Sequence, residues 1–258
     1  MITMKEMVER FKPILNRVED KKETFEDSIK IPYPNLEQIC GEFAPGECYS
    51  FFGGAKDNAL AIWRLNLMWQ LAKNGVPIHI LEGGREFQND FDDLLCLQTG
   101  IDRCHLRRGV MSAKEFQALS SALTTLRNYP ITWHSDEDVP PQYTTAICMK
   151  TVSLEDWQHY ETGVLWPQAQ ERSMVLFLFV KLPEDMPISW TSIYARNQII
   201  LPEEASSYLG LVDFQESYDF KLTRPQQRLR LQIKKTDFLK QDVLLFNYQA
   251  DSRMINEP

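Results

Sequence analysis

The clearest candidate for chemistry in the chain is a glycine-containing turn between a predicted strand and a predicted helix. Cys48–Phe52 is a short apolar run that stops at Gly53-Gly54, and residues 57–73 have a helical pattern. A turn at this point holds nucleotide phosphates in α/β proteins when it reads Gly-x-x-x-x-Gly-Lys-Ser/Thr. Backbone amides then surround the phosphates, the lysine binds the β- and γ-phosphates, and the hydroxyl binds magnesium. The segment here is GGAKDNALA, residues 53–61.

Three of the four defining residues of that loop are absent. Counted from Gly53, Asn58 stands at the second glycine, Ala59 at the lysine and Leu60 at the hydroxyl. Lys56 is nearby, but at a different point of the turn. Without the lysine and the hydroxyl, we expect negligible ATP hydrolysis of this type and no bound cofactor.

The histidines and cysteines do not predict a metal site. His134 precedes the acidic run 135–138, whose adjacent acids usually face solvent, and no second histidine follows at ligand spacing. His79 is expected to be a core residue of its own strand. The five cysteines are scattered and never spaced Cys-x-x-Cys, which is typical of reduced thiols in a cytosol.

Charge is distributed unevenly along the chain. The net charge is −8, which disfavours indiscriminate nucleic-acid binding. Residues 221–258, however, carry 8 Lys and Arg against 4 Asp and Glu. We interpret this basic run as a solvated sheet face, with a weak single-stranded nucleic-acid site as the alternative. The candidate contacts are Arg224, Arg228, Arg230, Lys234 and Lys235.

The spacing of apolar residues predicts strands that alternate with helices from residue 31 onward. Predicted strands lie at 48–52, 76–81, 131–133, 145–149 and 174–181, and predicted helices at 57–73, 88–99 and 112–128. Ser112 and Glu115 form a capping box at the start of the last helix. Residues 227–235 and 242–247 alternate strictly and predict an antiparallel hairpin. The fold class is therefore α/β, with a mostly parallel sheet flanked by helices. The longest clean apolar run, 174–180, is too short to cross a bilayer, so we expect a cytoplasmic protein.

The first 30 residues form a separate unit in the pattern. Apolar residues recur at spacings of three and four over residues 4–18, interrupted by Pro13, and the charged segment 21–30 follows as a linker. An apolar helix face must be buried, either on its own domain or on another molecule. We expect this helix to mediate assembly through Met7, Phe11, Ile14 and Leu15.

Several consecutive blocks resemble the C-terminal RecA-like motor domain of DnaB-type replicative helicases and its preceding linker helix. The most specific block is residues 99–137, which resembles the family stretch Gly-Ile-Asp-x-x-x-Leu-Arg-x-Gly followed by a capped helix. Residues 30–54 resemble the segment that leads into the first strand, and residues 228–255 resemble the closing hairpin. The match covers most of the chain and is weak over 138–226. It implies a linker or docking helix at 1–30 and a RecA-like domain at 31–258.

The residues that the resemblance makes functional are mostly replaced. Glu82 stands at the position of the water-activating glutamate, whereas Met149 or Lys150 occupies the position of the magnesium-shell aspartate. Thr236 stands at the position of the family's arginine that reaches the neighbouring subunit's nucleotide. Lys181 stands at the position of the glutamine that ends a sheet strand in the family.

The resemblance therefore implies a catalytically inactive helicase-like protein that acts by binding, in DNA replication, recombination or a mobile-element or defence complex. A divergent ATPase that uses Lys56 and Glu82 is the alternative. The segment 150–172, which matches the DNA-contacting loops, is acidic and aromatic, which favours a protein contact or a packed lid over base stacking.

Overall fold

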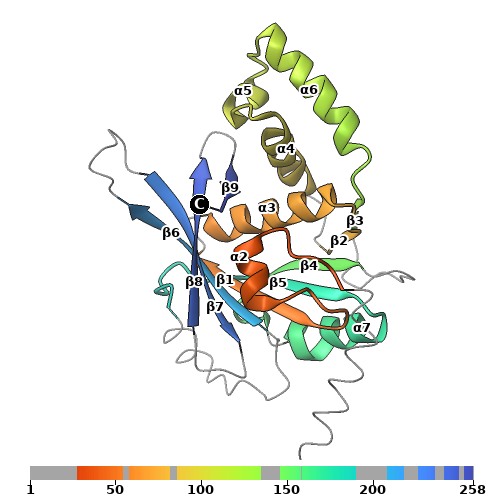
Figure 1. Ribbon diagram of the computed structural model, residues 1–258, viewed down its shortest axis with the longest axis vertical. Coiled ribbons are helices and arrows are strands. Elements are labelled where there is room, and N and C mark those ends of the chain that lie inside the picture. Colours follow the sequence, from red (N-terminus) through yellow and green to blue (C-terminus); the bar gives the residue numbers. More distant parts are fainter. Residues whose placement is uncertain are drawn as a thin grey trace, which may run out of the picture.

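The structure is a computed structural model that describes residues 28–54, 58–81, 86–134, 146–157, 159–189, 208–217, 226–235, 241–249 and 253–257. Within these residues one nine-stranded sheet passes through the molecule in the order β3-β2-β4-β5-β1-β6-β7-β8-β9 (Figure 1). The strands are β1 (Cys48–Gly54), β2 (Ile78–Leu81), β3 (Ile131–His134), β4 (Ile147–Ser153), β5 (Val175–Leu182), β6 (Tyr208–Ser217), β7 (Gln226–Lys235), β8 (Gln241–Gln249) and β9 (Met254–Asn256). The helices are α2 (Pro34–Cys40), α3 (Ala59–Lys73), α4 (Glu86–Thr99), α5 (Arg103–Arg108), α6 (Ala113–Leu126), the π-helix η2 (His159–Leu165) and α7 (Trp166–Glu171).

The sheet is parallel from β3 to β6 and antiparallel from β6 to β9. The predicted α/β class, the parallel core and the closing hairpin β7–β8 are confirmed. The sequence pattern did not predict β6, which pairs with β1 on one side and β7 on the other, or the short strand β9. β4 also extends to Ser153, beyond the predicted strand end, because its whole length pairs with β5.

Each face of the sheet has its own hydrophobic core. Side chains alternate along a strand, so Phe51 packs on the face covered by α3, and Phe52 packs on the face covered by η2 and α7. α3 buries 12 of its 15 residues, including Trp63 and Met68, because it lies between the sheet and the helices outside it. A helix this apolar on all sides is typical of a protein interior.

α4, α5 and α6 form an arm that projects beyond α3, away from the sheet (Figure 1). An ion pair between Arg64 and Asp90, 2.6 Å long and largely buried, attaches α4 to α3. The predicted capping box is confirmed, since the Ser112 hydroxyl accepts from the Glu115 amide and the Glu115 carboxylate accepts from the Ser112 amide. Only Ala122 of α6 is buried, so this helix has an unusually open surface.

The packed body includes the end of the predicted linker. Ile29 pairs with Phe43 and both are buried in the core of the α3 face. The predicted N-terminal helix, with Met7, Phe11, Ile14 and Leu15, lies outside the described residues. None of the helices in the described ranges has the length and apolarity needed to cross a membrane.

Candidate nucleotide site

The described end of the turn after β1 is Asn58, directly before α3. Asn58 has φ 56° and ψ 6°, the left-handed conformation that glycine adopts most easily. Asparagine tolerates this conformation better than most residues, so it is accommodated at the position where the motif has its second glycine. Lys56 lies outside the described residues.

Hydrocarbon side chains fill the start of α3, where the loop chemistry needs polar groups. Ala59 is fully buried and Leu60 is 4% exposed. Leu60 lies directly over Gly53, since a Cβ built on Gly53 would be 2.6 Å from the Leu60 Cβ and 3.4 Å from its Cγ. The main-chain oxygen of Val212 in β6 lies 3.3 Å from the same point. Gly53 is therefore enclosed by a leucine side chain and a neighbouring strand.

Met149 and Lys150, the two candidates for the magnesium-shell position, lie on opposite faces of β4. Met149 belongs to the core on the α3 face, whereas Lys150 lies on the other face and is 6% exposed. The Lys150 ammonium donates to the main-chain oxygen of Leu81 at 3.3 Å and lies 4.6 Å from the centre of the Tyr160 ring. Neither side chain supplies the carboxylate that holds magnesium in the family. Lys150 places an ammonium group on one face of β4, and Met149 places a thioether on the other.

The structure describes one of the three remaining positions of the predicted site, Lys181. Lys181 is near the end of β5, is exposed, and is the register partner of Gly53 in β1. The sheet therefore brings Lys181 next to the turn. Glu82 and Thr236 lie outside the described residues.

The aromatic segment after β4 is packed against the sheet. Trp157 is 1% exposed and its indole nitrogen donates to the Ser50 hydroxyl of β1 at 3.0 Å. Trp166 donates to the main-chain oxygen of Gly46 at 2.9 Å, and Tyr160 holds Lys150. These contacts agree with the expected packed lid, since each of the three rings contacts a residue of the sheet or of the segment that leads into it.

The basic hairpin is partly neutralised by an acid on the neighbouring strand. Arg230 of β7 is the register partner of Asp213 in β6 and donates to it through Nε at 2.7 Å and through a second, shorter bond from its terminal nitrogen. These bonds raise the pKa of Arg230, and Asp213 is 8% exposed. Arg228 lies on the same face of β7, because buried Leu229 separates it from Arg230. Lys234 and Lys235 belong to β7, and Arg224 lies outside the described residues.

The sheet brings together two histidines that are 55 residues apart in the sequence. His79 Nδ1 of β2 lies 2.9 Å from His134 Nε2 of β3, although no second histidine lies at ligand spacing from His134 in the sequence. Only the parallel pairing of β2 with β3 creates the contact, so no local sequence pattern predicts it. Among the described residues no group of three or more His, Cys, Asp and Glu side chains has metal-site geometry.

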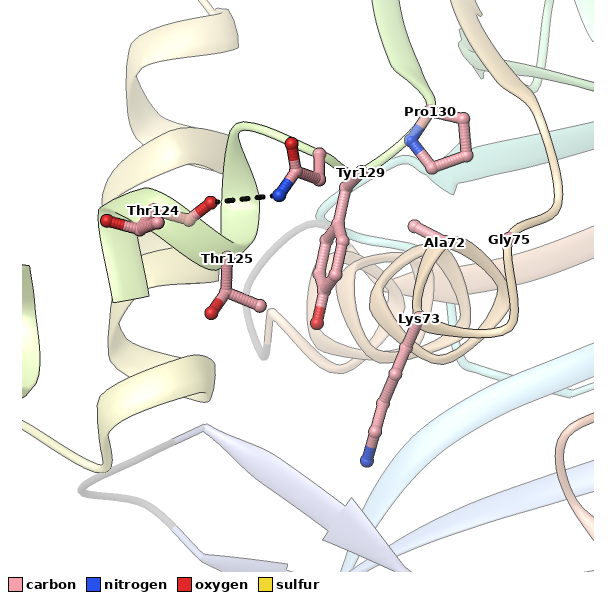
Figure 2. A pocket seen from close by; sticks show the side chains of 8 residues that line it. Ala72, Lys73, Gly75, Thr124, Thr125, Tyr129 and Pro130 are labelled. Atoms are coloured by element: carbon pink, nitrogen blue, oxygen red, sulfur yellow. Dashed lines mark hydrogen bonds between the residues drawn. The ribbon is translucent and has the colours of Figure 1, made fainter. Parts of the chain in front are cut away.

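A shallow hollow of about 360 Å³ lies where α3 and α6 end (Figure 2). Ala72 and Lys73 line it from α3 and Thr124 and Thr125 from α6, with the Tyr129 ring between them. The Asn128 amide donates to the Thr124 main-chain oxygen at 3.3 Å. The Lys73 ammonium lies 5.2 Å from the centre of the Trp69 ring. Two helix carboxyl ends, which carry partial negative charge, meet at this hollow and disfavour a phosphate there.

No protein-family model and no curated protein matches the sequence. Solved structures do match the fold. The ATPase domain of a DnaB-like helicase aligns over 96% of this chain and 98% of its own length, with a TM-score of 0.69 and 9% identity. A DnaB-like replicative helicase, solved in a study of its interactions with primase, aligns over 93% of this chain with a TM-score of 0.68 and 12% identity. This chain spans 65% of that helicase's length. The protein therefore has the RecA-like fold of DnaB-type helicase ATPase domains.

Proposed function

We propose that the chain is a helicase-like protein that does not hydrolyse nucleotide and acts by binding, as a subunit or regulator of a DNA replication, recombination, mobile-element or defence complex. The observation that carries this proposal is that Ala59 and Leu60 are buried hydrocarbon side chains at the start of α3, with Leu60 directly over Gly53. The helicase-like part of the proposal is supported by the similarity of the fold to DnaB-like helicase domains.

Phosphoryl transfer depends on positioned charge. A nucleotide site of this fold needs an ammonium on the β- and γ-phosphates and a hydroxyl and carboxylate around magnesium. Ala59 and Leu60 supply neither of the first two groups. Met149 and Lys150 supply no carboxylate, and a dication near the buried Lys150 ammonium would be repelled. These replacements lie on two different elements, the start of α3 and the strand β4, which supports a loss of function rather than one local variation.

The decisive experiment measures ATP and GTP turnover by the full-length chain, with and without single-stranded DNA. We expect no turnover above background. A matched variant with Ala59→Lys and Leu60→Thr restores the lysine and the hydroxyl of the motif. Its affinity for a fluorescent ATP analogue tests whether the rest of the fold can still bind nucleotide. Turnover by the natural chain that disappears in Glu82→Gln would instead establish the divergent ATPase.

Binding to a protein partner is the second part of the proposal. The sequence pattern predicts an N-terminal helix in which Met7, Phe11, Ile14 and Leu15 form an apolar stripe. Four of the five exposed large apolar side chains in the described ranges lie on or beside the α4–α6 arm, namely Phe91, Val110, Phe116 and Leu123. The replicative helicase that shares the fold was solved in a study of its interactions with primase. We infer that this chain assembles with another copy or with a helicase-like partner, through these two apolar surfaces.

A further inference from the structure

α6 carries a line of apolar residues at the spacing of a helix–helix contact. Phe116, Leu119, Leu123 and Leu126 follow one another at intervals of three and four residues, which places them on one side of the helix. Phe116 is 64% exposed and Leu123 is 45% exposed, and the two residues between and beyond them are half-buried. These four residues form the α6 seam.

The seam has the anchors by which one amphipathic helix recognises another. α6 projects with the arm away from the sheet, and Ala122 is its one buried residue (Figure 1). Phe116 and Leu123 are seven residues apart, the separation of the i and i+7 anchors in helix-in-groove recognition. Ser120, a small exposed residue, stands between them. The seam therefore fits a second helix laid along α6.

The segment that carries the seam is basic, although the chain as a whole is acidic. Residues 103–127 contain five Lys and Arg against one acid, Glu115, in a chain of net charge −8. Arg103 lies 3.0 Å from Asp93 of α4, and Arg107 lies 3.2 Å from Asp92. These two pairs fix α5 on α4 and use the acids of that helix that lie nearest.

Three further bases of this segment are exposed, namely Arg108, Lys114 and Arg127. In the heptad pattern of the seam, Arg127 directly follows Leu126 and takes a flanking position, where charges select the partner helix. The single acid, Glu115, accepts from the Ser112 amide and hydroxyl and caps α6. The charge presented beside the seam is therefore positive.

This charge determines which partner fits. A second copy of the arm would bring positive charge against positive charge, which opposes pairing of two α6 seams. We propose that the α6 seam docks an amphipathic helix of another protein, whose apolar side is flanked by Asp and Glu. This inference rests on the binding part of the proposed function and gives the chemistry of the partner at the arm.

The experiment measures binding of a fluorescent three-heptad peptide to the full-length chain by anisotropy. The peptide has Leu at positions a and d of each heptad and Glu at the flanking positions e and g. A matched peptide has Lys in place of Glu, and like charges keep either peptide from pairing with itself. We expect saturable binding of the acidic peptide, weakened by salt, and about tenfold weaker binding of the basic one.

Variants of the chain test the two parts of the seam separately. Phe116→Ser with Leu123→Ser should abolish binding of the acidic peptide, because both anchors are lost. Arg127→Glu should weaken binding of the acidic peptide and strengthen binding of the basic one. Val243→Ser, at an exposed apolar residue of β8, is the matched control and should bind as the natural chain does. Circular dichroism checks that every variant folds.

Absence of saturable binding of the acidic peptide, or equal affinity for the two peptides, would overturn the proposal. Tighter binding of phosphatidylserine-containing vesicles or of single-stranded DNA, lost in the variant with Phe116→Ser and Leu123→Ser, would also overturn it and assign the seam to that ligand. ATP turnover by the natural chain would overturn the inactive-helicase proposal without changing these affinities, so the two failures are distinguishable.

Discussion

At the residue scale, single side chains determine what the turn after β1 can do. Leu60 covers Gly53, and Asn58 keeps a left-handed backbone conformation. The last residue of the turn is thus left-handed, and hydrocarbon side chains stand where the nucleotide motif has its lysine and its hydroxyl. Backbone geometry alone cannot bind a nucleotide triphosphate productively, because the β- and γ-phosphates need a cation beside them.

Gly53→Ala should destabilise the protein, because the added methyl group would lie 2.6 Å from the Leu60 Cβ. We expect a loss of about 1–3 kcal/mol in the free energy of unfolding, typical of overpacking. Urea denaturation measures it. Gly163→Ala in η2 is the control, since its methyl group would meet only His159 Nδ1 at 3.5 Å. Equal stability of the two variants would refute this close approach of α3 to β1.

At the element scale, α6 depends on its first turn, because the rest of the helix is largely exposed. Hydrogen bonds from the Ser112 backbone and side chain, with a smaller contribution from His105, lower the pKa of Glu115. A folded-state pKa below the unfolded value means that the cap stabilises the helix at neutral pH. This stabilisation is lost as the pH falls through the Glu115 pKa.

Amide hydrogen exchange in the first turn of α6 should therefore lose protection in acid. Glu115→Gln should flatten this pH dependence, since glutamine keeps a capping acceptor without a titrating proton. Ser112→Ala should cost about 1 kcal/mol of local stability at neutral pH. A Glu115→Gln profile that follows the natural chain would disprove the role of this carboxylate.

The β7–β8 hairpin should bind single-stranded DNA weakly, because the guanidinium of Arg230 is already paired with the Asp213 carboxylate. Each phosphate contact changes the slope of log affinity against log salt by roughly 0.7. Asp213→Asn should free Arg230, tighten binding and steepen that slope, whereas Arg228→Glu with Arg230→Glu should abolish binding. Fluorescence anisotropy at several salt concentrations measures both effects. Nanomolar binding by the natural chain at physiological salt would favour a nucleic-acid partner over a protein.

At the scale of the whole molecule, the parallel sheet has helices on both faces and an arm that extends away from it. Deleting residues 1–22, or introducing Phe11→Asp with Leu15→Asp, should leave a folded domain that no longer assembles. Burial of each such apolar side chain is worth about 1.5–3 kcal/mol, and a charge at the interface removes that gain. Phe116→Ser with Leu123→Ser on α6 should have the same effect.

Sedimentation of the full-length chain, alone and with a candidate helicase partner, measures this prediction. Val243→Ser is the control, because Val243 is an equally exposed apolar residue (54%) on β8, away from the arm. Identical masses for all proteins would mean that the N-terminal helix packs on its own domain.

The sequence alone determined the local elements and the missing chemistry. Periodicity indicates the extent of α3, and the Ser112–Glu115 capping box marks the start of α6, because helix ends depend on nearby residues. The replacements at Ala59 and Leu60 are visible in the sequence because the nucleotide motif has fixed spacing, whereas only the family resemblance indicates Met149 or Lys150 at the aspartate position.

Only the tertiary structure decided which distant side chains meet. The pairings His79–His134, Asp213–Arg230 and Lys150–Tyr160 depend on strand order, strand register and the position of η2. The buried Asn66 of α3 shows the same effect, since it donates to the main-chain oxygen of Arg253 and accepts from the main-chain amide of Ile255. Local sequence preferences carry no information on contacts between strands that are far apart in the chain, because the order of strands follows from the packing of the whole sheet.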